Sequence, residues 1–553
     1  MTSQARRLHL QGGLNVATPA RAISTAAVGE LREERRVIFA SSLGTVFEWY
    51  DFYIYATLAP FFASVFFPPG NQTTALLNAF VNYAAGFLVR PFGALVFGRI
   101  GDLVGRKYTF LITIAVMGLS TALVGVLPTY ASIGMLSPVL LLLLRLAQGL
   151  ALGGEYGGAA TYVAEHSPDE KRGYNTSWIQ TTATLGFFLC LLVIGLCRSN
   201  LSDAAFRSWG WRIPFLASIV LLMISIYIRL KLQESPVFRK MKSEGKGSKA
   251  PLKDSFANWK NAKVVILALI GATAGQGVVW YTGQFYALFF LGTTLKIAWD
   301  TVYWLIALSL AIGTPFFIVF GKLSDKIGRK WIMMIGCLLA VFTYRPLFAG
   351  LTHYGNPELE AFNQKNKITL TATNCQVHIF ATPLTKYSDC DKVQNFLSAR
   401  SLEYEKIPGT PGSPPVIAIN ETKITGVDEA KLKTVLAGLA YPTTAKDSEI
   451  NKPMILLLLT IMVIYVTMVY GPIAAFLVEL FPTRIRYTSM SLPYHIGNGW
   501  FGGLLPLIAT ALVAATGDIY YGLWYPIIVA AMTFVVGSLF VRETKHHRIR
   551  DDF

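Results

Sequence analysis

Long apolar runs separated by short polar gaps dominate the pattern of this chain. A membrane-spanning helix needs about 20 mainly apolar residues, and twelve runs reach or approach that length. They are residues 37–62, 77–98, 108–127, 135–164, 177–197, 213–230, 264–291, 301–321, 331–352, 453–477, 490–513 and 521–541. The pattern therefore predicts an all-α polytopic membrane protein with twelve transmembrane helices. An even number of spans places both termini on the same side of the membrane.

Two internal repeats divide the spans into similar halves. The decapeptide Gly98–Lys107 (GRIGDLVGRK) returns as Gly321–Lys330 (GKLSDKIGRK), which gives a shared skeleton G-x-x-x-D-x-x-G-R-K. A second pattern, Glu165-x-x-Pro-x-x-x-Arg172, returns as Glu479-x-x-Pro-x-x-x-Arg486. Because self-similarity of this kind reports a repeated architecture, we expect two pseudo-symmetric six-helix halves.

Basic residues indicate the orientation in the membrane. The links that contain Arg106, Lys171, Arg329 and Arg484 are basic, whereas the opposite links at 63–76, 128–134 and 514–520 contain no Lys or Arg. One opposite link, with Arg198, Arg207 and Arg212, departs from this trend. The positive-inside rule then predicts that both termini are cytoplasmic. The net charge of +17 is thereby explained by loops, and a nucleic-acid surface is not expected.

Composition supports the same organisation: 53% of the residues are hydrophobic and 15% charged, against roughly 25% charged in soluble domains. We predict the following units: a cytoplasmic N-terminal segment (1–36), an N-terminal half (37–230), a cytoplasmic linker (231–263), a C-terminal half in two parts (264–354 and 449–541), a periplasmic insertion (355–448) and a cytoplasmic tail (542–553).

The insertion is polar, and a structureless loop of about 90 residues would be unusual in a compact protein. Strand-like runs at Gln376–Phe380 and Val416–Asn420, with helix-like stretches at Lys392–Arg400 and Asp428–Gly438, predict a small α/β unit. The insertion contains two cysteines, Cys375 and Cys390, which are expected to form a structural disulfide in an oxidising compartment.

The insertion also resembles a glutaredoxin in the order of Val377–Phe380, Cys390, Pro415 and Gly426. A C-x-x-C motif, however, would place the attacking thiolate at position 387, which is Tyr387. Because dithiol exchange needs that thiolate, redox catalysis is not favoured. No Cys/His set has metal-ligand spacing.

Ionisable residues inside spans are costly and therefore indicate function. The first span holds Glu48 and Asp51, three residues apart and hence on one helix face. Two carboxylates at low dielectric resist ionising together, which suits proton coupling. Arg90 and Arg145 can bind a substrate carboxylate, although either could instead pair with Glu48 or Asp51. Glu155, about 15 Å along the helix from Arg145, is a third proton-coupling candidate.

Neutral polar and aromatic side chains complete the predicted substrate site. These are Tyr50, Gln148, Gln276, Tyr281, Gln284 and Asn498. His495 lies in the same region, but a single histidine is more often a satisfied core residue than a proton relay.

The repeated motifs are predicted to form a cytoplasmic gate rather than a substrate site. Gly suits tight turns, Asp suits a helix N-terminus, and Arg or Lys can meet helix ends or a Glu. The predicted gate residues are Gly98, Asp102, Gly105, Arg106, Lys107, Glu165 and Arg172, with Gly321, Asp325, Gly328, Arg329, Lys330, Glu479 and Arg486 in the second half.

The duplicated loop, the twelve predicted spans and the central linker resemble those of the major facilitator superfamily. The strings Glu48–Phe52 (EWYDF), Arg90–Gly93 (RPFG), Gly153–Gly158 (GGEYGG) and Trp209–Pro214 (WGWRIP) resemble its metabolite:proton symporter branch, which includes carriers of shikimate, 2-oxoglutarate, citrate and proline/betaine. The resemblance implies alternating access of two halves around a midplane site and uptake across a bacterial inner membrane. It does not cover the insertion.

The sequence thus predicts a proton-coupled symporter that imports a small carboxylate or zwitterion, works as a monomer in the bilayer and needs no cofactor or metal. Two alternatives stay open: a gradient-independent facilitator, and a membrane-anchored sensor or redox protein that works through residues 355–448. No catalytic constellation or Walker loop is present, so an enzyme is not expected.

Overall fold

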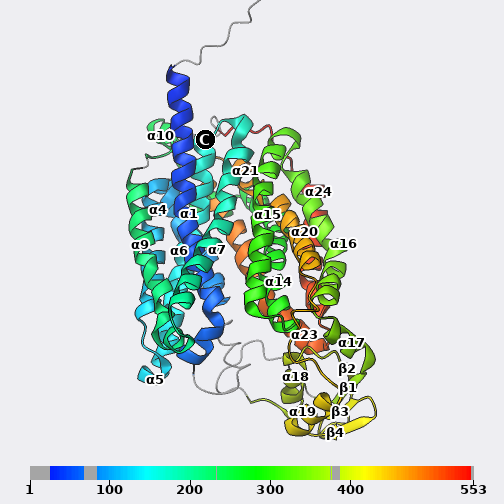
Figure 1. Cartoon of the computed structure of the whole chain (residues 1–553). Coiled ribbons are helices and arrows are strands. Elements are labelled where there is room, and N and C mark those ends of the chain that lie inside the picture. The colour runs from blue at the N-terminus through cyan, green and yellow to red at the C-terminus, as the bar shows by residue number, and fades with distance from the viewer. Residues whose placement is uncertain (1–24, 68–83, 232, 374, 377–385, 550–553) are drawn as a thin grey trace, which may run out of the picture.

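The computed structural model describes residues 25–67, 84–231, 233–373, 375–376 and 386–549, and it is a bundle of long helices with a small α/β domain at one end (Figure 1). Ten described helices or helix series are long and apolar enough to cross a membrane. The first predicted span lies within α1 (Thr25–Phe66). The second ends in α3 (Arg90–Leu103), and its first residues, 77–83, lie outside the described part.

The N-terminal half continues with four long helices that match spans three to six. These are α4 (Arg106–Val126), α6 (Leu136–His166), α7 (Arg172–Asn200) and α9 (Arg212–Leu230). Apolar side chains on the outside of the bundle, such as Met223 and Leu143, are exposed. Because lipid solvates such side chains, exposure costs little in a membrane.

The C-terminal half repeats this plan but with interrupted helices. Span seven is a series of α-helical and π-helical turns: α12 (Trp259–Ala268), η3 (Leu269–Thr273), α13 (Ala274–Tyr281), η4 (Thr282–Tyr286), α14 (Ala287–Phe289) and η5 (Phe290–Thr294). Spans eight and nine are α15 (Trp299–Ile327) and α16 (Lys330–Gly355).

The last three spans lie beyond the inserted domain. Span ten comprises α20 (Lys452–Tyr470) and α21 (Ile473–Leu480), and span twelve comprises η7 (Tyr521–Leu523) and α24 (Trp524–Phe540). Span eleven comprises α22 (Arg486–His495), the π-helical η6 (Ile496–Gly502) and α23 (Leu505–Thr516). Mid-helix π-turns often mark functional sites, and here they occur in spans seven and eleven.

The linker between the halves carries two short helices, α10 (Pro236–Ser243) and α11 (Pro251–Phe256). Ser235 caps α10 by accepting a hydrogen bond from the Phe238 N–H at 3.1 Å. The linker and the C-terminus lie at the same end of the bundle, opposite the inserted domain (Figure 1).

The insertion folds as predicted into an α/β unit. After α17 (Pro357–Lys365) come β1 (Ile368–Ala372), α18 (Asp389–Ala399), β2 (Glu405–Pro408), β3 (Val416–Ile419), β4 (Thr422–Thr425) and α19 (Glu429–Gly438). The strand order is β2-β1-β3-β4. β1 pairs parallel with β2 and antiparallel with β3, and β3 pairs antiparallel with β4.

The insertion has its own hydrophobic core. Leu370 lies opposite Ile417, and Ile417 opposite Ile424; all three are buried together with residues of α18 and α19 such as Leu397 and Leu432. The Cys375–Cys390 disulfide is present, which confirms that prediction.

The first predicted strand, Gln376–Phe380, falls largely on residues that the structure does not describe. Gln376 lies outside any strand, residues 377–380 lie outside the described part, and the observed first strand is Ile368–Ala372. Its three apolar residues, Ile368, Leu370 and Ala372, alternate with threonines, and threonine favours strands.

Candidate functional site

The first copy of the repeated loop forms a buried charge cluster between the halves. Arg106 lies 3.1 Å from Asp102 and 3.7 Å from Glu165. Arg486 of the other half lies 3.0 Å from the same Glu165 oxygen. The Asp102 carboxylate also accepts the Thr488 N–H at 2.9 Å, in the first turn of α22. All these charged side chains are buried.

The second copy of the loop builds an equivalent cluster. Arg329 lies 2.9 Å from Asp325 and 3.1 Å from Glu479. Arg172 of the N-terminal half lies 2.7 Å from Glu479, and Asp325 accepts the Tyr174 N–H at 2.8 Å in the first turn of α7. Each Asp therefore faces a helix N-terminus of the other half, where the helix dipole favours a negative charge.

We call these two clusters together the latch. The structure brings its predicted charged members together, with one ion pair and two aspartate–backbone hydrogen bonds across the halves in each copy. The cross-half helix pairs α3–α22 and α7–α15 pack at the same place. A Cβ on Gly98 would come within 3.0 Å of the Thr488 Cα, and a Cβ on Gly321 would contact Ser177, so these glycines permit the close approach.

Gly105 and Gly328 serve the turn that follows. Their φ values are 141° and 112°, a region that L side chains rarely adopt. A Cβ on Gly105 would also contact the carboxylate of Glu234, and one on Gly328 that of Glu543. Lys107 and Lys330 instead donate to carbonyls at the ends of neighbouring helices, those of Leu230 and Val541.

A third repeat that sequence reasoning missed completes the latch. The Glu234 carboxylate accepts the Lys107 N–H at 3.3 Å, and the Glu543 carboxylate accepts the Arg329 N–H at 2.8 Å. The next residue in each case, Ser235 or Thr544, donates its hydroxyl to the buried Glu165 or Glu479. The sequence signal for this third repeat is the dipeptide, Glu-Ser or Glu-Thr, that follows the last span of each half.

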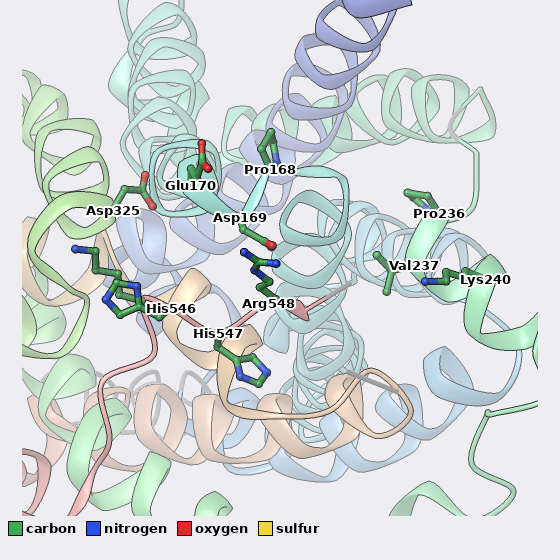
Figure 2. A pocket seen from close by; sticks show the side chains of 11 residues that line it. Pro168, Asp169, Glu170, Pro236, Val237, Lys240, Asp325, His546, His547 and Arg548 are labelled. Atoms are coloured by element: carbon green, nitrogen blue, oxygen red, sulfur yellow. The ribbon is translucent and has the colours of Figure 1, made fainter. Parts of the chain in front are cut away.

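A cavity of about 970 Å³ opens at the same end of the molecule (Figure 2). It is lined by the link between spans four and five, by α10, by Asp325 of the latch and by the C-terminal tail: Pro168, Asp169, Glu170, Pro236, Val237, Lys240, Asp325, Lys545, His546, His547 and Arg548. The tail therefore lies beside the latch, and the Arg172 guanidinium donates to the His547 carbonyl at 3.3 Å.

Apart from the latch, a further buried charge cluster lies inside the N-terminal half. Arg229, in the last turn of α9, lies 2.6 Å from Glu48 and 2.6 Å from Glu155. Thr113 donates to the other Glu155 oxygen at 2.8 Å. Two carboxylates share one guanidinium, so a single added proton makes this triad electrically neutral. The sequence pattern does not single out Arg229, because it lies at the edge of an apolar run, where a charge that flanks the span is the usual explanation.

Asp51 is separated from that triad. It is 6% exposed and accepts a hydrogen bond from Ser218 of α9 at 2.5 Å. Among the described residues, no cation lies within ion-pairing distance of its carboxylate. Glu48 and Asp51 both face α9, as their spacing indicates, but they contact residues at different depths and do not form a pair.

Arg90 lies where the two halves meet. Its guanidinium lies 4.0 Å from the ring centre of Phe87 and 5.3 Å from that of Phe52. A Cβ on Gly499 of η6, in the other half, would lie 3.9 Å from the Arg90 Cβ. Arg90 is 8% exposed, and within the described residues no carboxylate forms an ion pair with it. The alternative that Arg90 is the counter-ion of Glu48 or Asp51 is not what this structure shows.

Aromatic and neutral polar side chains surround this interface. Gln276 and Asn498 exchange two hydrogen bonds at 3.0 and 2.8 Å, and the Tyr53 hydroxyl donates to Gln284 at 3.4 Å. Tyr281 packs against Phe87 with ring centres 5.6 Å apart.

The remaining predicted binding residues lie inside the N-terminal half. Arg145 donates to Gln148 at 2.7 Å, which in turn donates to Thr121 at 2.6 Å, and the Tyr50 hydroxyl donates to the Pro214 carbonyl at 2.8 Å. His495 is buried, and neither ring nitrogen has a hydrogen-bond partner in the part of the chain that the structure describes. It is therefore not the satisfied core histidine that the sequence favoured.

Two pseudo-symmetric helical halves, a latch at one end and buried charges at their interface define a secondary transporter. The family model for "Sugar (and other) transporter" matches residues 37–268 and 429–551. The chain therefore belongs to this transporter family within the major facilitator superfamily, and it is not an enzyme.

Individual relatives are also transporters. The chain is 31% identical over 538 residues to the Escherichia coli inner membrane metabolite transport protein YhjE, covering 94% of this chain and 96% of that one. It is 37% identical over 329 residues to the E. coli alpha-ketoglutarate permease (59% and 74% covered) and 36% over 325 residues to the E. coli proline/betaine transporter (57% and 64% covered). The proton:xylose symporter XylE shares the fold, with a TM-score of 0.62 at 15% identity over 94% of this chain and 98% of that one.

Proposed function

We propose that this transporter is a proton-coupled symporter for a small organic carboxylate, imported across a bacterial inner membrane with both termini cytoplasmic. The observation that carries the proposal is Arg90, a buried cation without a carboxylate partner among the described residues. A buried unpaired charge is costly, so a site that keeps one at the interface of two moving halves favours an anionic ligand. A planar guanidinium can bind a carboxylate through two parallel hydrogen bonds.

Aromatic rings support a compact ligand at this place. Phe52, Phe87 and Tyr281 surround Arg90 from both halves, so a substrate bound there would contact both. Such contacts give alternating access a physical basis, because the substrate is released when one half moves away from the other. A zwitterion such as betaine is also compatible with this aromatic site around Arg90, since aromatic faces attract a quaternary ammonium group.

Proton coupling is assigned to Asp51 and to the Glu48–Arg229–Glu155 triad. Asp51 has no cationic partner in the described part of the chain, so its neutral, protonated form is the one that burial favours. The triad holds two carboxylates on one cation and gains neutrality with one proton. Both sites lie inside the N-terminal half and include residues of α1, the helix whose Phe52 ring contacts Arg90.

Uptake into proteoliposomes tests the proposal. An inward proton gradient should accelerate uptake of one member of a panel of mono- and dicarboxylates, proline and betaine. Arg90→Gln should abolish that uptake, and Arg90→Lys should weaken apparent affinity at least tenfold because a lysine cannot bind a carboxylate bidentately. Arg99→Gln, an exposed arginine of the same helix, is the matched control.

Coupling is tested separately. Asp51→Asn should retain exchange of bound substrate but lose accumulation driven by the proton gradient, whereas Asp300→Asn, at an exposed position at the start of α15, should behave as the parent. Uptake that ignores the proton gradient in the parent protein would make the chain a facilitator and contradict the coupling proposal.

A further inference from the structure

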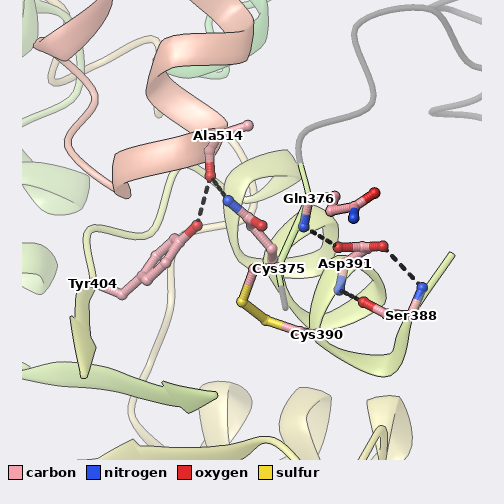
Figure 3. Close-up of a disulfide and its surroundings, with 8 residues drawn as sticks. Cys375, Gln376, Ser388, Cys390, Asp391, Tyr404 and Ala514 are labelled. Atoms are coloured by element: carbon pink, nitrogen blue, oxygen red, sulfur yellow. Dashed lines mark hydrogen bonds between the residues drawn. A yellow bond between two sulfur atoms is a disulfide. The ribbon is translucent and has the colours of Figure 1, made fainter. Parts of the chain in front are cut away.

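The inserted domain is fastened to the end of span eleven opposite the latch. Gln394 of α18 donates its side-chain N–H to the Ala514 carbonyl in the last turn of α23. The Tyr404 hydroxyl donates to the same carbonyl at 2.9 Å (Figure 3). The Tyr404 N–H donates to the Gly517 carbonyl at 3.3 Å. The last carbonyls of a helix have no partner within the helix, so the insertion supplies the cap for α23.

Helix α18 of the insertion also contacts the residues that follow span seven. Lys296, two residues beyond η5, donates from its ammonium to the Ala399 carbonyl at the C-terminus of α18, at 2.7 Å. The Ala445 N–H donates to the Lys296 carbonyl at 3.1 Å. The last carbonyls of a helix lack partners within the helix, which leaves the Ala399 carbonyl able to accept this bond. Helix α18 therefore joins the ends of spans seven and eleven, and we call this pair of attachments the clamp.

The two clamped spans are those with π-helical interruptions, and both face the N-terminal half. In span seven, Trp280 packs on Trp49 of the first span with ring centres 5.3 Å apart. In span eleven, the Trp500 indole N–H donates to the Leu88 carbonyl at 3.2 Å. Movement of either span against the N-terminal half therefore displaces an end that α18 holds.

The disulfide fixes the first turn of the clamping helix. Cys390 is the second residue of α18 and is buried, whereas Cys375 is only half-buried. Asp391 ties the same two segments, because its carboxylate accepts the Gln376 N–H at 2.7 Å and the Ser388 N–H at 2.8 Å (Figure 3). Gln394 follows Cys390 by four residues, one helical turn, so the covalent bond and the clamp lie on one face of α18.

We propose that the Cys375–Cys390 disulfide is a thiol–disulfide input site, at which a dithiol reductant on the insertion's side of the membrane releases the clamp and speeds the movement of spans seven and eleven. This inference rests on the transport cycle of the proposed function, although not on its substrate.

The exchange proceeds in two balanced steps. A thiolate of the reductant attacks the more accessible Cys375 sulfur, and the S–S bond breaks as Cys390 leaves as a thiolate and takes up a proton. The second thiol of the reductant then attacks the mixed disulfide and releases Cys375. Two electrons and two protons pass to the protein, and the reductant leaves as its own disulfide.

Hydrogen exchange of the full-length protein in nanodiscs, with and without dithiothreitol, tests the clamp without needing a substrate. Reduction should speed exchange of the amides in the last turn of α23, residues 513–517, at least tenfold, while amides in the middle of α24 stay unchanged. Reoxidation should restore slow exchange. Gln394→Ala should speed the same amides with the disulfide intact, and reduction should then add less than twofold.

Two further measurements make the outcome decisive. In a Cys375→Ser/Cys390→Ser variant, amide exchange at residues 513–517 should equal that of the reduced parent and should not change with dithiothreitol. The transport rate of the reduced parent should be at least twice that of the oxidised parent. Unchanged exchange at residues 513–517 on reduction, or an equal effect of reduction in Gln394→Ala, would overturn the proposal. Loss of proton-driven uptake with the exchange pattern intact would count against the proposed function alone.

Discussion

At the scale of single residues, the arrangement around Arg229 makes a sharp prediction about stability. Replacing one partner of a buried ion pair strands the other charge and typically costs about 3–5 kcal/mol. Arg229→Met leaves Glu48 and Glu155 facing each other without their cation, so we expect it to lower the free energy of unfolding by about that amount. Thermal unfolding in detergent, followed by circular dichroism, would measure it.

The same residues supply the control for this prediction. A triple variant with Glu48→Gln, Glu155→Gln and Arg229→Met carries no buried charge at this place, so it should unfold at a temperature closer to the parent's than the single variant does. Arg99→Met, on the exposed side of α3, should change stability by less than about 0.5 kcal/mol. A single variant as stable as the triple variant would show that the triad is not a coupled unit.

Turn glycines give a second prediction at this scale. Gly105→Ala must adopt a φ of 141° and must also displace the Glu234 carboxylate. Gly134 has a φ of 57°, and a Cβ there would meet nothing within 4 Å. Gly134→Ala should therefore cost only backbone strain, about 1–3 kcal/mol, and Gly105→Ala should cost more. Comparing the two unfolding temperatures checks this, and equal costs would mean that Glu234 does not hold the turn.

At the scale of elements, the sequence predicted what depends on local pattern. Apolar runs located the spans, and the two internal repeats located the charged members of the latch. The partners of Glu48 and Asp51 were not predictable, because a spacing of three residues fixes a shared face but not what another helix places against it. The partners are Arg229 and Ser218, both of α9, which lie more than 160 residues further along the chain.

The attachment of α18 to span seven adds a dependence on pH. Burial, with a contribution from the neighbouring Arg400, lowers the pKa of Lys296 from its ordinary 10.5 to about 8. A detached Lys296 would bind its proton more tightly than the docked one, so raising the pH from 8 towards 10.5 should strengthen docking. Amide exchange at the end of α18, corrected for its intrinsic pH dependence, should slow over that interval.

Two variants isolate the group responsible. Lys296→Met has nothing to titrate and Lys296→Arg keeps its charge throughout, so both should lose this pH dependence while α18 remains folded. If the parent and Lys296→Met showed the same pH profile, another group would control the docking.

At the scale of the whole molecule, the latch predicts how the two halves share their closed state. Glu165 and Glu479 are related by the internal repeat, and each binds one arginine of its own half and one of the other. A hydrogen bond to a charged group contributes about 1.5–3 kcal/mol. Glu165→Gln and Glu479→Gln should therefore each move the equilibrium between closed and open latch by about ten- to a hundredfold.

Because the two clusters close the same face, their effects should add in the double variant. Spin labels at exposed Arg99 of α3 and exposed Lys326 of α15, on helices of opposite halves, would report the separation by double electron–electron resonance. The open population should rise from parent to single to double variant, with substrate affinity in exchange assays largely unchanged. If either single variant opened the latch as fully as the double variant, the clusters would act as one cooperative lock, since neither could hold the halves without the other.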